Sequence, residues 1–209
     1  MRLRLVVFLP FLFCGSLTPV HAQMLDSIRS AVQVKPKFVF GLSSRFSSVD
    51  GSPSRTSKLF VGYDYDKVFR LELGINYMPN PGVTQTFPFP GDTLLETNQL
   101  TYLGLQAEYT FYRKGHWKFG FPVQVGIGSN KATERYNNHL RFSRTFMVIP
   151  VEPGLNALYY FYDWIGLKAG MGVRMSFGKA FSVLSGPYYN MGIAFFPGTL
   201  YQRIKDKRS

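Results

Sequence analysis

Apolar and polar residues alternate along most of this chain, and this alternation limits the possible folds more than any other feature. Its clearest instance is residues 68–77, where Phe69, Leu71, Leu73, Ile75 and Tyr77 alternate with Arg70, Glu72, Gly74 and Asn76. Successive side chains of a β-strand point to opposite faces, so a period of two predicts strands with one apolar face. The sequence therefore predicts an all-β protein.

The same pattern recurs along the chain. Further alternating segments lie at about residues 37–46, 58–64, 102–111, 117–128, 149–161, 165–174 and 189–195. Together with residues 68–77 they bring the predicted count to eight strands. A chain of 209 residues fits a single domain built from them.

The connections between these segments alternate in length. Long ones are expected near residues 46–57, 78–98, 129–145 and 177–187, and short ones at 65–66, 113–116 and 162–163. Alternate connections of an up-and-down meander lie at opposite ends, so the long loops share one rim and the tight turns the other. Outer-membrane barrels have this asymmetry, with short periplasmic turns and longer extracellular loops. We therefore predict an eight-stranded antiparallel up-and-down transmembrane β-barrel.

The chemistry of the two faces indicates which one meets lipid. The polar face is rich in glycine and carries scattered charges of both signs, which suits a narrow lumen filled by paired side chains. The other face is apolar, as a bilayer requires, because Arg or Lys costs about 2–4 kcal/mol at the midplane. The predicted lumen polar network consists of Arg70, Glu72, Gln106, Glu108, Gln124, Glu152, Asn156, Lys168 and Arg174.

Aromatic residues gather at the predicted tight-turn end of the strands. They are Tyr109, Phe111, Tyr112, Trp117, Tyr159, Phe161, Tyr162 and Trp164. Such crowding is typical of an aromatic girdle at a membrane interface, and ordinary strand aromatics are the alternative.

Hairpin geometry predicts one ion pair in the lumen. A turn centred on Asp163 places Glu152 opposite Arg174, with both side chains inward. Pro150 and Pro153 lie in the same segment, and because proline donates no backbone hydrogen bond we expect a β-bulge near residues 150–153. A one-residue slip there would turn Glu152 outward.

The first 22 residues have the three parts of a signal peptide. Arg2 and Arg4 provide a basic start, residues 5–13 an apolar stretch, and Val20-His21-Ala22 a small-residue cleavage site. Cleavage would remove Cys14, the sole cysteine, so no disulfide or thiolate ligand is expected. The predicted organisation is a signal peptide at 1–22, a periplasmic lead-in segment at 23–36, the barrel domain at 37–197 and a basic tail at 198–209.

Charge constrains the partners. Loss of Arg2 and Arg4 lowers the 24 basic residues to 22, against 12 acidic ones. These charges are scattered over loops, which disfavours nucleic acid, and no cofactor or metal site is predicted. A basic rim is a possible site for the phosphates of surface glycolipid, with a solvated loop as the alternative. Its residues are Lys131, Arg135, Arg141 and Arg144.

The signal peptide, the eight alternating segments and the rhythm of long and short connections resemble the small eight-stranded outer-membrane barrels, the family of the OmpA transmembrane domain and of OmpX. The resemblance covers residues 37–196. It implies an outer-membrane location in a Gram-negative cell and insertion by the barrel-assembly machinery. The family's usual terminal aromatic is displaced here, because Phe195-Phe196 is followed by a basic tail.

Three functions are compatible with this architecture. The leading hypothesis is a monomeric structural or surface-interaction barrel without enzymatic activity, in contact with membrane lipid, whose long extracellular loops are the working part. A lipid-modifying enzyme is an alternative, with His139 beside Ser129, Ser143 or Glu134 as a candidate site. A narrow channel or small-ligand barrel is a third, if the strand glycines leave the lumen open.

Overall fold

A computed structural model describes residues 26–49, 52–79, 82–89, 92–136, 139–178 and 184–206. The predicted signal peptide therefore lies outside the described residues. The strands are β1 (Lys37–Val49), β2 (Ser52–Tyr65), β3 (Phe69–Tyr77), β4 (Gly82–Phe89), β5 (Asp92–Lys114), β6 (Trp117–Tyr136), β7 (His139–Tyr162), β8 (Ile165–Phe177) and β9 (Gly186–Phe195).

Eight of these strands form a closed antiparallel ring. Each pairs with its neighbour in the chain, β3 pairs with β5 across the β4 excursion, and β9 closes the ring against β1 through pairs such as Phe40 with Phe195. Closure removes the exposed sheet edges that an open sheet would carry through a bilayer. The eight-stranded up-and-down barrel predicted from the alternation is confirmed.

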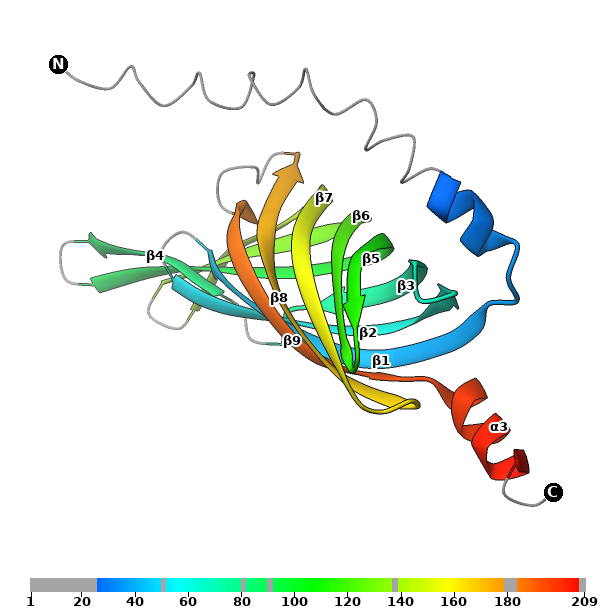
Figure 1. Cartoon of the computed structure of the whole chain (residues 1–209). Helices are drawn as coiled ribbons and strands as arrows, with labels where there is room; N and C mark the ends of the chain where they lie inside the picture. Colours follow the sequence, from blue (N-terminus) through cyan, green and yellow to red (C-terminus); the bar gives the residue numbers. More distant parts are fainter. Residues whose placement is uncertain are drawn as a thin grey trace, which may run out of the picture.

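The predicted long loops are wrong in one respect, because strands continue into most of them. β4 pairs with the first residues of β5, and β5, β6 and β7 stay paired up to the tip at Tyr136 and His139. Figure 1 shows β4 at the far left, at the opposite end of the molecule from α3. These extensions lack the apolar–polar alternation of the barrel wall, so the sequence pattern did not reveal them.

The tight turns and both ends of the barrel chain lie on the other rim. Asp66, Lys67 and Gly115 have positive φ angles of 49°, 59° and 57°, which lets the strands reverse within two or three residues. Two helices flank this rim: residues 26–32, and α3 (Pro197–Asp206), which occupies the predicted basic tail. Pro197 suits the first position of α3, where no backbone donor is needed. In the described part of the chain, no helix is both long and apolar enough to cross a membrane.

The outer wall of the barrel is an apolar surface. Every wall strand contributes large side chains that are 42–59% exposed: Leu42, Leu59, Leu73, Ile75, Leu103, Leu105, Val125, Ile127, Leu155, Val173, Met191 and Ile193. A continuous apolar patch of this extent is not stable in water and marks a surface that faces lipid. The chain is therefore a transmembrane barrel of the outer-membrane type.

Aromatic side chains surround the tight-turn end of this wall, as predicted. Phe111, Tyr112, Phe161 and Tyr162 are exposed there, and the Trp117 ring lies 4.9 Å from the Tyr159 ring. Amphipathic rings are favoured at the level of lipid headgroups. They place the turn rim at one membrane interface, which is the periplasmic one for short turns.

The expected bulge near residues 150–153 is absent. β7 and β8 pair Val151 with Met175 and, in the same register, Gly154 with Gly172, so no residue is inserted between them. Proline removes a hydrogen bond from the ladder but does not change the residue count that sets the register. Glu152 therefore keeps its inward direction.

Candidate functional site

The lumen concentrates the charge of the barrel. Ten charged side chains of the described residues are at most 5% exposed and point inward: the cations Arg45, Lys58, Arg70, Lys118, Lys168 and Arg174, and the anions Asp64, Glu72, Glu108 and Glu152. Buried charges are costly unless they are paired and hydrogen-bonded.

Glu152 is the centre of the first cluster. Its carboxylate forms ion pairs with Arg45 and with Arg174, whose Nε lies 2.5 Å from Oε1. It also accepts hydrogen bonds from the Tyr102 hydroxyl at 2.8 Å and from Gln124 Nε2 at 2.9 Å. The Glu152–Arg174 ion pair expected from the hairpin register is thus present, and four strands besides β7 contribute to the cluster.

Glu72 and Glu108 form a second cluster, in which Lys168 contacts both carboxylates and Lys58 contacts Glu72. Lys58 Nζ lies 2.9 Å from Glu72 Oε2 and donates to Gln106 Oε1 at 2.9 Å. Lys168 Nζ bridges the two carboxylates, 2.9 Å from Glu108 Oε2 and 3.5 Å from Glu72 Oε1. Every acid in this cluster therefore has a cation within ion-pair distance.

Asp64 forms a third cluster near the tight-turn rim. Arg70 donates to Asp64 Oδ2 through Nε at 3.0 Å and Nη2 at 2.7 Å, and Lys118 Nζ donates to the same oxygen at 3.2 Å. The Arg70 guanidinium also lies 5.4 Å from the centre of the Phe196 ring. Phe196 belongs to a buried apolar cluster nearer the tight turns, so this contact joins the charged residues to that cluster.

Apolar side chains close the lumen at both ends. Met78, Leu100, Tyr102, Val148 and Leu184 form one buried cluster towards the extracellular rim. Val39, Phe60, Leu158, Tyr160, Ala194 and Phe196 form the other towards the turns. Between them a cavity of about 10 Å³ remains beside Lys58, Lys168 and Asn190, which is space for about one water molecule.

Two inward glycines make room for the Glu152 cluster. A Cβ atom at Gly126 would lie 2.6 Å from Tyr102 Cδ2, and one at Gly104 would lie 2.7 Å from Gln124 Nε2. Both distances are shorter than van der Waals contact, so larger residues would displace the groups that bond Glu152. The space beside the glycines of the polar face is therefore occupied by neighbouring side chains, so these glycines do not open the lumen.

The structure places all nine residues of the predicted polar network inside the lumen. Sequence reasoning omitted Arg45, Lys58, Asp64, Tyr102 and Lys118, which complete the three clusters. The sequence contained a signal for them, because each stands at a polar-face position of its own alternating segment.

The predicted basic rim does not form one face. Lys131 pairs with Thr145, and Arg144 pairs with Ala132, so Lys131 and Arg144 lie on opposite faces of the β6–β7 sheet. The side chains of Arg135 and Arg141 lie outside the described residues. We expected a single loop over residues 129–145. Instead β6 and β7 continue as paired strands, in which successive side chains point to opposite faces.

The two serines considered as alternative partners of His139 lie at different levels of the β6–β7 sheet. Ser143 pairs with Thr133, whereas Ser129 pairs with Met147, which puts the two serines about 13 Å apart at ~3.3 Å per residue. The His139 side chain lies outside the described residues. Among the described residues no group of three His, Cys, Asp or Glu side chains is placed to hold a metal.

Several solved structures are similar to this chain. Neisserial surface protein A matches with 15% identity and a TM-score of 0.49, over 76% of this chain and 96% of its own. Ail, the attachment invasion locus protein of Yersinia pestis, matches with 11% identity and a TM-score of 0.48, over 77% of this chain and 96% of its own. The N-terminal β-barrel domain of Pseudomonas aeruginosa OprF matches with 14% identity and a TM-score of 0.45, over 77% of this chain and 98% of its own.

No protein-family model matches the sequence, and neither does any curated protein sequence. Structural likeness of this degree carries no information about activity.

Proposed function

We propose that this barrel is a non-enzymatic surface-interaction protein, whose working part is the sheet that projects beyond its extracellular rim. One observation supports this most strongly. β5, β6 and β7 have 23, 20 and 24 residues, whereas a tilted strand needs about 9–11 to cross a bilayer. Roughly half of each strand therefore stands outside the membrane.

The strands of the projecting sheet are continuously paired, which favours binding. Its strands stay in register from Thr101 opposite Ser129 up to Leu94 opposite Tyr136. Asn130 Nδ2 donates to Asn98 Oδ1 at 2.6 Å across the same strands. A preformed surface loses less conformational entropy on binding than a flexible loop does.

Its side chains are of the types that protein interfaces use. Phe142 is exposed and the Arg144 guanidinium lies 4.1 Å from its ring centre, while Met147 is exposed on the opposite face. Aromatic residues, arginine and methionine are enriched at protein–protein interfaces. We infer that the partner is a protein on the extracellular side.

A channel function has less support. Among the described residues the charged clusters and the two apolar layers lie in the lumen, and a cavity beside Lys58 and Lys168 holds about one water. A diffusion pore would need a continuous aqueous path, which an eight-stranded barrel with a filled interior does not provide.

The test is to shorten the projecting sheet without disturbing the barrel. Asn130 and Phe146 are paired, so replacing residues 131–145 with an Asn-Gly turn keeps the register of β6 and β7. Cells displaying this variant are expected to attach less to cultured animal cells and to one another than cells displaying the full chain. Heat-modifiable electrophoretic mobility checks that both barrels are closed.

The matched control is Thr145→Ala, which changes the same sheet without removing an exposed apolar or arginine side chain. It should attach like the full chain, while Phe142→Ala with Arg144→Ala should attach less. Undiminished attachment by the shortened variant to both targets would refute the proposal.

A further inference from the structure

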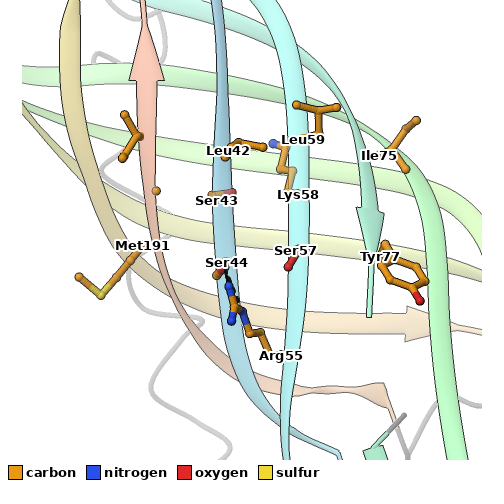
Figure 2. A pocket seen from close by; sticks show the side chains of 12 residues that line it. Leu42, Ser43, Ser44, Arg55, Ser57, Lys58, Leu59, Ile75, Tyr77 and Met191 are labelled. Atoms are coloured by element: carbon orange, nitrogen blue, oxygen red, sulfur yellow. Dashed lines mark hydrogen bonds between the residues drawn. The ribbon is translucent and has the colours of Figure 1, made fainter. Parts of the chain in front are cut away.

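The lipid-facing wall contains a groove of about 480 Å³ across β9, β1, β2 and β3. It lies between Met191 on β9 and Tyr77 on β3, and its lower end is bounded by Leu42, Leu59 and Ile75. Its volume is within the range of ligand pockets, about 300–1,000 Å³. Figure 2 shows Met191 and Tyr77 on either side of Ser44 and Ser57.

Strand register explains the groove. Met191 pairs with Ser44, Ser44 with Ser57, and Ser57 with Tyr77, so these four outward side chains stand side by side. Two short hydroxymethyl groups between two long side chains leave a hollow in the wall. One level nearer the turns, Ile193, Leu42, Leu59 and Ile75 form an unbroken apolar row.

Arg55 stands at the extracellular end of this groove. It is exposed, its Nη2 and Nε donate to Ser44 Oγ at 2.9 Å and 3.2 Å, and it lies 5.8 Å from the Phe46 ring centre. Among the described residues no carboxylate forms an ion pair with it. The dashed lines of Figure 2 show Ser44 holding the guanidinium at the mouth of the groove.

The depth of Arg55 assigns it to the outer leaflet. Its partner Phe46 is eight residues beyond Phe38, which is about 26 Å along the strand and about 20 Å along the membrane normal at a tilt of ~40°. The apolar band of such barrels is about 25 Å tall, so Arg55 reaches its outer edge. A phosphate at that edge would meet the guanidinium with favourable geometry and charge.

We propose that the groove holds one acyl chain of a phosphate-bearing glycolipid of the outer leaflet, with a phosphate bound by Arg55. The acyl chain lies over Ser44 and Ser57 between Met191 and Tyr77, and Ser44 preorganises the guanidinium for the phosphate. A second copy of this chain is a poorer occupant. A two-fold axis along the membrane normal would place two Arg55 side chains at the same depth, facing each other.

Native mass spectrometry of the purified full chain tests the proposal. The protein, released from detergent with one equivalent of lipid A, is expected to retain one lipid. Arg55→Gln should lower retention on the order of tenfold, because a charge-assisted hydrogen bond is lost. Lipid A stripped of its phosphates should bind the native chain and Arg55→Gln equally weakly.

Further variants separate the parts of the site. Ser57→Leu fills the floor of the groove and should lower retention of both forms of lipid A. Arg144→Gln, a matched loss of charge on the projecting sheet, should leave retention unchanged. If Ser57→Leu fails the heat-modifiability check, the exposed Arg55→Gln decides alone.

Three outcomes would overturn the proposal: equal retention of phosphatidylglycerol, a dimer in place of the lipid adduct, or the same loss for Arg144→Gln as for Arg55→Gln. Failure here is distinguishable from failure of the proposed function. Arg55→Gln leaves the projecting sheet intact, so cells displaying it should attach normally, and the shortened-sheet variant should still retain lipid A.

Discussion

At the scale of single residues, Glu152 shows how one buried acid organises the barrel interior. Arg45 on β1, Tyr102 on β5, Gln124 on β6 and Arg174 on β8 all donate to its carboxylate. Removing this charge would leave two buried guanidinium groups without their counter-ion. Removing one partner of a buried ion pair lowers stability strongly, because the other charge stays buried without a counter-ion. Replacing both partners with apolar residues changes stability much less.

Glu152→Gln is expected to lower the free energy of unfolding by about 3–5 kcal/mol. The amide can still accept hydrogen bonds, but it cannot compensate Arg45 and Arg174. Urea titration in phospholipid vesicles, followed by heat-modifiable mobility, measures the change.

The half-buried Glu134, on the projecting part of β6, provides the control for that experiment. Glu134→Gln should change stability by no more than about 0.5 kcal/mol. Adding Arg174→Gln to Glu152→Gln should cost less than the sum of the two single changes, because they remove the same ion pair. Equal stability of the Glu152 and Glu134 variants would show that the cluster contributes nothing to folding.

At the scale of elements, β7 passes through two environments along its length. Its turn-side half pairs within the barrel wall, and its first half belongs to the sheet that we propose projects above the membrane. Leu155 and Met147 are similarly exposed, 51% and 60%, although they belong to different halves. Exposure alone therefore does not tell which of them meets lipid.

Arginine substitution separates the two environments. Leu155→Arg is expected to destabilise the barrel in phospholipid vesicles by up to about 2–4 kcal/mol, and Met147→Arg by about 0–1 kcal/mol. The difference arises because a charge in the hydrocarbon loses its hydration. Equal losses in urea titrations of the two variants would contradict the membrane position assigned to β7.

At the scale of the whole molecule, the lumen is a charged layer between two apolar layers. Its described residues include six buried cations and four buried anions, an excess of two positive charges. The apolar layers separate this charge from water at both rims. We therefore expect the barrel to be closed to bulk flow and its interior field to favour anions.

Planar-bilayer recordings test this closure. The chain is expected to give no porin-sized conductance steps, and any small leak under a KCl gradient should reverse towards the chloride potential. The positive excess of the lumen is the reason for this sign. Large steps, or a leak that prefers potassium, would contradict the closed and anion-favouring interior.

The sequence by itself determined the wall of this protein. Alternation reports which face of a strand meets which environment, and turn positions report which residues of a hairpin are opposite each other. These two local rules sufficed for the eight strands, the outward apolar face and the Glu152–Arg174 pair. Each depends on residues that are neighbours in the chain or joined by one tight turn.

Only the tertiary structure decided what meets across the lumen and above the membrane. Arg45 and Glu152 are 107 residues apart, and their contact depends on the diameter and stagger of the closed ring. The strand extensions and the separation of Lys131 from Arg144 depend on pairing where no lipid face imposes an alternation. The groove depends on which outward residues the register of four strands brings side by side. A one-dimensional pattern carries information only where two faces of a strand meet different surroundings.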